Sequence, residues 1–213
     1  MIKSITFALI LVVLIQQICS HGMMLVPPNR SSLWRLNKTA PVNYNDNQNF
    51  CGGSSIQWGQ FGGKCGPCGD RYSDPHPQDN ENTGKYGQGI VVAEYTAGSE
   101  IDVQVLLTAN HLGFFKYSLC VLKDPNAPEL DENCFLPLTF SDGSAKYNVQ
   151  QRDKQVYNKI KLPKTISCDR CVLRWHYTAG NNWGVCENGT SALGCGPQET
   201  FRSCSDIRIV NVY

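Results

Sequence analysis

The chain has 213 residues, 41% of them hydrophobic, and a formal net charge of +1 at pH 7. That length suits one domain. The near-neutral charge argues against nucleic acid or an anionic membrane as the main partner, because either would favour a basic face. An insoluble, uncharged polymer is compatible with this balance.

The first twenty residues have the pattern of a secretory signal peptide. Lys3 gives a positive start, residues 5–15 are almost wholly apolar, and Ser20 is a small residue at the expected cleavage point. The apolar run is too short for a membrane-spanning helix, which needs ~20 residues. We therefore predict a signal peptide at 1–20 and a single secreted, monomeric domain at 21–213, with no membrane span.

Few segments after residue 21 have helical periodicity. Residues 41–89 are rich in Asn, Gly, Asp, Pro and Cys, which is typical of a long loop region with at most a short helix. Strand-like alternation follows at 90–95, 101–107, 114–122, 157–162, 171–177 and 205–212. Short strands separated by turns predict an all-β fold, an immunoglobulin- or fibronectin-III-like antiparallel β-sandwich with long disulfide-linked loops.

Ten cysteines follow the predicted cleavage point, and an even number in a secreted chain predicts up to five disulfides. Cys120 and Cys134 flank a plausible loop, so we predict that they pair. The two C-x-x-C sequences at 65–68 and 168–171 have a spacing also used by zinc ligands. They lie about a hundred residues apart in an oxidising context, which favours disulfides.

Three sequons, at Asn29, Asn37 and Asn188, are candidate N-glycosylation sites.

The four histidines are His21, His76, His111 and His176. After cleavage at Ser20, His21 would offer two donors, its imidazole and a free α-amine with a pKa near ~7.7. One further imidazole would complete a tetragonal set of three nitrogens, which suits Cu(II). The alternative is a frayed chain end with no ligand role. We expect His76 in a loop and His176 exposed on the polar face of a strand, both outside the site.

Three segments around these histidines carry a resemblance to a known family. They are H-G at 21–22, A-N-H-L-G-F at 109–114 and Q-E-T-F-R-S-C-S-D-I at 198–207. With them, the chain from His21 onward resembles the lytic polysaccharide monooxygenases of auxiliary-activity family fifteen over essentially its whole length.

The resemblance implies a role for individual residues. His21 and His111 would hold one copper ion in a histidine brace. Phe201 falls at the axial position, where some relatives carry Tyr, and a phenyl ring there would only block that face. Glu199 would hydrogen-bond the oxygen species, and Ala109 would shape access to the metal. Without the resemblance, each of these residues has an alternative interpretation. His111 is then a turn histidine and Phe201 a core residue. Glu199 is then a surface carboxylate or an ion-pair partner of an arginine such as Arg202.

The resemblance also implies oxidative cleavage of a polysaccharide. An external electron donor would reduce the copper, and hydrogen peroxide or dioxygen would then oxidise C1 or C4 beside a glycosidic bond. Chitin is the first choice of substrate and cellulose the second. Tyr44, Trp58 and Tyr72 are candidates for stacking on sugar rings, with core packing as the alternative. A non-catalytic chitin-binding protein and a copper carrier stay open as other functions.

Overall fold

The computed structural model describes residues 21–129 and 132–211. The predicted signal peptide at 1–20 lies outside the described residues. The elements in chain order are β1 (His21–Val26), η1 (Arg30–Arg35), α1 (Ser54–Gly59), β2 (Ala93–Thr96), β3 (Glu100–Ala109), β4 (Phe114–Val121), η2 (Glu132–Cys134), β5 (Leu136–Phe140), β6 (Tyr147–Asn148), β7 (Gln155–Lys161), β8 (Cys168–Thr178), β9 (Trp183–Val185), β10 (Ser191–Leu193) and β11 (Thr200–Val210). No helix in the described part of the chain is long and apolar enough to cross a membrane.

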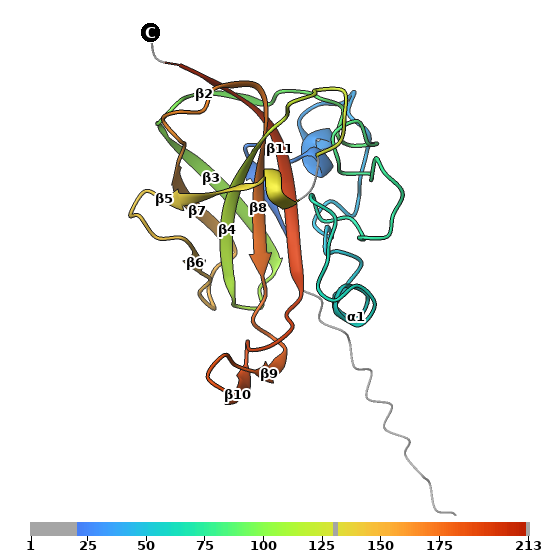
Figure 1. Ribbon diagram of the computed structural model, residues 1–213, viewed down its shortest axis with the longest axis vertical. Helices are drawn as coiled ribbons and strands as arrows, with labels where there is room; N and C mark the ends of the chain where they lie inside the picture. Colours follow the sequence, from blue (N-terminus) through green and yellow to red (C-terminus); the bar gives the residue numbers. More distant parts are fainter. Residues whose placement is uncertain (1–20, 130–131, 212–213) are drawn as a thin grey trace, which may run out of the picture.

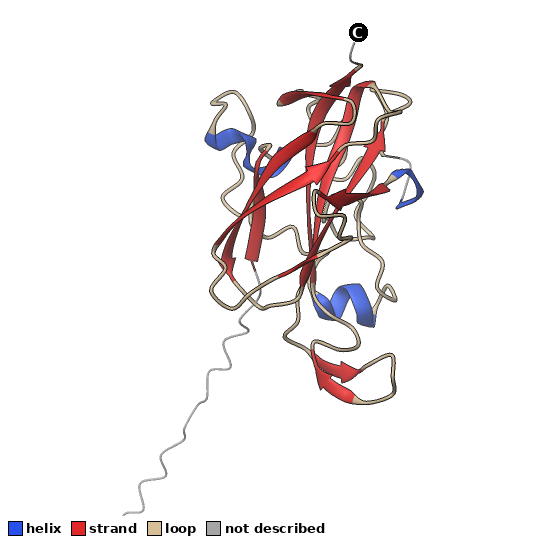
Figure 2. Cartoon of the chain, turned by 90° about the vertical axis from the view of Figure 1, so that its left-hand side faces the viewer, coloured by secondary structure: helices blue, strands red, loops and turns tan. Residues whose placement is uncertain are grey.

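The strands form a sandwich of two sheets, as Figures 1 and 2 show from two sides. Strands β1, β3 and β7 form one sheet, and β4, β8, β11 and β2 form the other. Strand β5 hydrogen-bonds both β7 and β4 and so joins the two. The predicted β-sandwich with short helices and long disulfide-linked loops is confirmed. One edge differs, because β2 pairs with β11 in parallel. A long loop rather than a hairpin leads into β2, so the connection does not force β2 to run antiparallel to its neighbouring strand.

The core follows from the alternation seen in the sequence. Ile101, Val103, Val105 and Leu107 of β3 are all buried and face the other sheet. Aromatic side chains of β4, β8 and β11 face them, among them Phe115, Tyr117, Trp175, Tyr177 and Phe201. Burying one such side chain contributes roughly 1.5–3 kcal/mol, so this core is the main source of stability.

Five disulfides cross-link the chain, and one of them, Cys68–Cys204, ties the long loop region to β11. The pairs are Cys51–Cys65, Cys68–Cys204, Cys120–Cys134, Cys168–Cys171 and Cys186–Cys195. The prediction for Cys120–Cys134 is confirmed, and both C-x-x-C sequences form disulfides, but only one pairs internally. Cys68 and Cys204 are 136 residues apart. A cross-link over so long a loop removes much of the unfolded chain's freedom.

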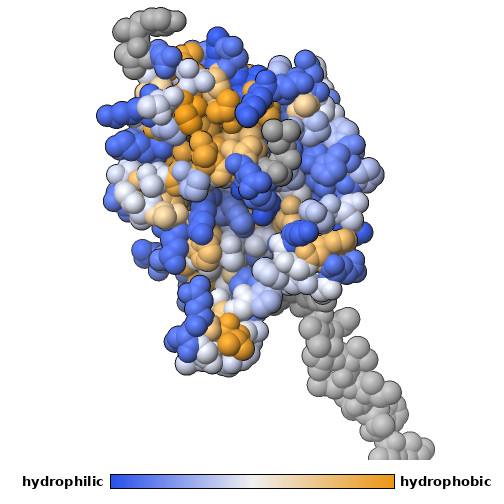
Figure 3. Space-filling view, viewed as in Figure 1, coloured by the Kyte–Doolittle hydropathy of each residue, from blue (hydrophilic) through white to orange (hydrophobic). Residues whose placement is uncertain are grey.

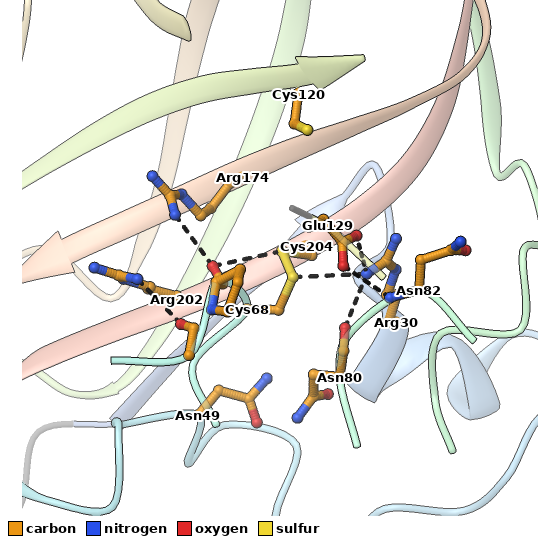
Figure 4. Close-up of a disulfide and its surroundings, with 12 residues drawn as sticks. Arg30, Asn49, Cys68, Asn80, Asn82, Cys120, Glu129, Arg174, Arg202 and Cys204 are labelled. Atoms are coloured by element: carbon orange, nitrogen blue, oxygen red, sulfur yellow. Dashed lines mark hydrogen bonds and ion pairs between the residues drawn. A yellow bond between two sulfur atoms is a disulfide. The ribbon is translucent and has the colours of Figure 1, made fainter. Parts of the chain in front are cut away.

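A buried ion-pair network lies beside the Cys68–Cys204 disulfide (Figure 4). The Arg30 guanidinium donates to both Asp206 oxygens at 2.9 and 2.8 Å and lies 2.7 Å from Glu129. It also donates to the Asn80 carbonyl at 2.9 Å. Burial alone would lower the pKa of Arg30, but the two carboxylates outweigh it and raise that pKa. The network thus fixes η1 and the residue 80 loop to β11.

Replacing Arg30 with methionine should lower the free energy of unfolding by about 3–5 kcal/mol, because two buried carboxylates lose their cation. Urea unfolding of the purified protein measures the change. The control is Lys159→Met, which breaks the exposed pair with Asp102 and should alter stability little. Equal effects of the two changes would show that the Arg30 network is not stabilising.

The Asn29 side chain is fully buried and donates to the Met24 carbonyl at 2.6 Å. A glycan on this nitrogen does not fit the folded chain, so the candidate sequon at Asn29 is excluded on structural grounds. Asn188 is exposed and Asn37 is half-buried, so these two stay candidates.

Candidate metal centre

The first residue of β1 lies next to the end of β3. His21 is the register partner of Ala109, two residues before His111. Gly22 allows this close approach, because a Cβ atom there would lie 2.9 Å from the Leu107 side chain and 3.1 Å from that of Trp175. The pairing of β1 with β3 therefore brings two histidines that are distant in sequence to one end of the sandwich.

His111 is held by a tight loop between β3 and β4. Asn110 anchors this loop by donating to the carbonyls of Gln150 and Asp153 at 2.8 and 2.7 Å. Leu112 and Gly113 both have positive φ, 56° and 82°. A Cβ at Gly113 would clash with the β8 backbone, so glycine is required there.

The backbone of His111 is fixed on both sides by the end of β8. Its N–H donates to the Tyr177 hydroxyl at 3.1 Å, and its carbonyl accepts from Gly180 at 2.8 Å. These bonds do not involve the imidazole, so the side chain is positioned but kept available as a ligand.

Phe201 lies next to His21. Its ring centroid is 6.4 Å from that of His21, and it stacks on Tyr177 at 5.8 Å. The side chain is 1% exposed and belongs to the core cluster. Phe201 is therefore both a core residue and the aromatic neighbour of His21, so the two interpretations of this residue do not exclude each other.

Glu199 directly precedes β11, and its carbonyl accepts from the Ala179 N–H at 2.9 Å. The residue is 6% exposed, which contradicts the reading of it as a surface carboxylate. Side chains two residues apart in an extended backbone lie on the same side, so the Glu199 side chain lies on the side of Phe201. The Arg202 side chain lies on the opposite side. Arg202 pairs with Glu132.

The surroundings favour neutral imidazole at His111. Burial lowers the pKa of His111, and the nearby charge of His21 lowers it further. Neutral imidazole is the form that binds a metal. In residues 21–129 and 132–211 no group of three or more His, Cys, Asp and Glu side chains could hold an ion. Two imidazoles together with the α-amine that His21 would carry after cleavage make a nitrogen donor set, which fits copper.

The sequence analysis missed Asn181, whose amide lies 2.6 Å from Nδ1 of His111. Its Oδ1 has no hydrogen-bond partner among the described residues. With Oδ1 turned toward the ring, it would accept from Nδ1–H and leave the Nε2 lone pair free for a metal. The sequence Ala-Gly-Asn-Asn at 179–182 indicates only a turn, so no sequence signal predicts the contact of Asn181 with His111.

Replacing Asn181 with alanine should weaken copper binding about 10–100-fold, the usual cost of losing an outer partner of a histidine ligand. Asn181→Asp keeps an acceptor and should restore most of the affinity. Calorimetric titration with Cu(II) measures both, and exposed Asn126→Ala is the control. Unchanged affinity in Asn181→Ala would mean that the contact does not orient His111.

The other two histidines lie outside this centre. His76 is in a loop, as expected, where it is exposed and lies 2.8 Å from Glu81. The expectation for His176 was wrong, because the side chain is half-buried and its Nε2 is inaccessible. The outer face of β8, which the sequence alternation marks as polar, is flanked by the α1 loop and the β9–β10 hairpin, which form one cavity with His176.

Comparison with known proteins identifies the class. The family model for lytic polysaccharide mono-oxygenases, described as cellulose-degrading, matches residues 21–207. The chain therefore belongs to the lytic polysaccharide monooxygenases, which are copper-dependent oxidoreductases that act on polysaccharides with an external reductant and an oxygen species. No curated protein matches it significantly.

The solved structures give the narrower assignment. An auxiliary-activity family 15 enzyme from Thermobia domestica, in the Cu(I) state, shares 45% identity and a TM-score of 0.85, covering 89% of this chain and 98% of that one. The chain is thus a family fifteen lytic polysaccharide monooxygenase, as the sequence motifs indicated. The cellulose-active enzyme CelS2, in complex with copper, is 16% identical with a TM-score of 0.47, covering 90% and 100%.

Proposed function

We propose that His21 and His111 hold the single copper ion, with the α-amine and imidazole of His21 and the imidazole of His111 as ligands. The register pairing of His21 with Ala109 carries this proposal, because it brings the chain's predicted new N-terminus beside the second histidine. The copper-bound state of the Thermobia domestica enzyme, which shares the fold and 45% of the sequence, supports it.

Copper supplies the redox chemistry when bound, and this chain's residues place and protect it. Phe201 presents a buried ring that cannot ligate, so it would keep water and other ligands from that side. The carboxyl group of Glu199 would hydrogen-bond the oxygen species and hold its proton. Ala109, beside His21, leaves space for a small molecule to approach.

The substrate we propose is chitin, with cellulose as the alternative. Exposed aromatic rings favour a sugar surface, because their apolar faces stack on pyranose rings while their polar edges stay hydrated. Trp183, two residues after Asn181, is 70% exposed, and Tyr44 is 83% exposed. Trp58 and Tyr72 are less exposed, at 38% and 43%. Trp183 begins the hairpin that projects beyond the end of the sandwich (Figure 2).

Export is the second part of the proposal. We infer that residues 1–20 are a signal peptide, and that the domain at 21–213 acts as a secreted monomer with a glycan at Asn37 or Asn188. Five disulfides support an oxidising compartment.

The test is mass spectrometry of soluble products from β-chitin and from cellulose. The protein beginning at His21 would be loaded with copper and given ascorbate, with a metal-stripped sample as control. Oxidised chitin oligosaccharides that need both copper and ascorbate would establish chitin as a substrate. Oxidised products from cellulose alone would show that the substrate is cellulose and not chitin. Copper binding without oxidised products from either polymer would favour a copper carrier, and no copper binding would favour a chitin-binding protein.

A further inference from the structure

The segment 179–182, which joins β8 to β9, lies against the backbone and the ring of His111. The Gly180 N–H donates to the His111 carbonyl at 2.8 Å, and the Asn181 amide lies 2.6 Å from Nδ1 of the same residue. Glycine allows this close approach, because a Cβ atom at Gly180 would lie 2.9 Å from the nitrogen of Gly113. The path of this segment therefore decides where Asn181 lies relative to the His111 ring.

One buried side chain holds the end of this segment. Gln198 is 4% exposed, and its Oε1 accepts from the Asn182 N–H at 2.9 Å. Its Nε2 donates to the Asn182 carbonyl at 3.0 Å and to the Cys195 carbonyl at 2.7 Å. The oxygen thus meets a donor and the nitrogen meets two acceptors, as the chemistry of an amide requires. Because both backbone groups of Asn182 are bonded to one rigid group, the residue next to Asn181 is fixed in place.

Gln198 is itself anchored just before β11. Its carbonyl accepts from Nε1 of Trp58 in α1 at 2.8 Å, and the neighbouring Pro197 carbonyl accepts from the Asn182 side chain at 3.2 Å. Strand β11, which carries Phe201, begins two residues after Gln198. Gln198 therefore joins α1, the end of the 179–182 segment and the strand that places Phe201 beside His21.

The β9–β10 hairpin depends on the same side chain for its orientation. It forms a two-stranded sheet of its own, and such a pair of strands is marginally stable by itself. Its base is held by the Gly194 N–H, which donates to the Asn182 carbonyl at 2.8 Å, and by the bond from Gln198 to Cys195. Figure 3 shows a hydrophobic group exposed on the hairpin at the lower end of the molecule. A side chain that holds both Asn182 and the hairpin base keeps the hairpin and the 179–182 segment in one arrangement.

We propose that Gln198 is a positioning residue for the copper centre, which fixes Asn182 and thereby holds Asn181 against the His111 ring. Its side chain bonds to Asn182 and Cys195, so it acts on the ligand through the 179–182 segment. The proposal rests on the assignment of His111 as a copper ligand. It adds that the base of the hairpin and the orientation of the His111 ring are set by the same amide.

The first test replaces Gln198 with methionine, a flexible side chain that can fill the buried space but makes none of the three hydrogen bonds. Copper affinity should fall about tenfold, at the lower end of the cost of losing an outer partner of a histidine ligand. The Cu(II) electron paramagnetic resonance spectrum should change, because the imidazole is no longer held in one orientation. Calorimetric titration and the spectrum are measured on protein that begins at His21.

The matched control is Gln78→Met. Gln78 is 1% exposed, and its Nε2 donates to the Arg71 carbonyl at 3.0 Å, in the loop before residue 80. Both substitutions remove a buried amide from backbone partners, so both should lower the midpoint of thermal unfolding. Only Gln198→Met should alter the copper spectrum and affinity. An equal effect of Gln78→Met on the copper would show general destabilisation and would overturn the proposal.

A double variant tests whether Gln198 acts through Asn181. In protein that already carries Asn181→Ala, adding Gln198→Met should change copper affinity by less than about twofold, because the contact that Gln198 supports is already gone. A further tenfold loss in the double variant would mean that the two residues act independently, which contradicts the proposed route.

Gln198→Asn keeps the amide but shortens its reach by one methylene, and it serves as the second variant in case Gln198→Met does not fold. Its copper spectrum should shift in the same direction. Unaltered copper affinity and spectrum in whichever of the two variants folds would overturn the role of Gln198. Retained copper affinity in His111→Ala would instead overturn the assignment of the ligand itself, so the two failures are distinguishable.

Discussion

Replacing His111 with alanine is expected to weaken copper binding by more than about a hundredfold and to abolish polysaccharide oxidation. Loss of a ligand should exceed the 10–100-fold cost of losing an outer partner of a ligand. The fold should survive, because the backbone bonds of His111 to Tyr177 and Gly180 do not depend on its imidazole. Calorimetric titration with Cu(II) and the electron paramagnetic resonance spectrum measure the change.

The matched control is His76→Ala, which removes an exposed loop histidine paired with Glu81. Copper affinity should be unchanged in that variant. If His111→Ala kept its affinity and spectrum while His76→Ala lost them, the assignment of the second ligand would be wrong.

A protein that keeps one extra residue before His21 is expected to lose tight copper binding and activity to a similar extent. The α-amine, with a pKa near ~7.7, has a lone pair available at mildly alkaline pH, whereas the nitrogen of a peptide bond holds its proton and cannot ligate. The imidazoles of His21 and His111 would remain but could not replace the third nitrogen. Copper titration of the extended protein tests this.

A protease site placed so that cleavage leaves His21 first provides the control for the extended protein. Cleavage should restore both copper affinity and oxidised products in the same sample. Full activity before cleavage would exclude the amine as a ligand and would leave the centre with two imidazoles alone.

Much of the fold could be predicted because local alternation records which side of a strand is buried. The pattern at 101–107 predicted β3 and its core face, and that at 171–177 predicted most of β8. Strand β1 and the β9–β10 hairpin were not predicted. Residues 21–26 are mostly apolar without alternation, and Trp183–Val185 is too short to show a period. Of the disulfides, only Cys120–Cys134 was predicted as a pair, because these two cysteines flank a plausible loop.

The sequence by itself determined the class of protein, the β-rich fold and the candidate ligands His21 and His111, because these depend on local pattern, on position after a signal peptide and on short motifs. Only the tertiary structure decided what those residues touch. It places Asn181 on the His111 ring, 70 residues away, and sets Lys116, His176 and Arg202 in one row across three strands. Contacts between distant segments follow from strand register, and a change of one residue in register would turn every side chain to the opposite face.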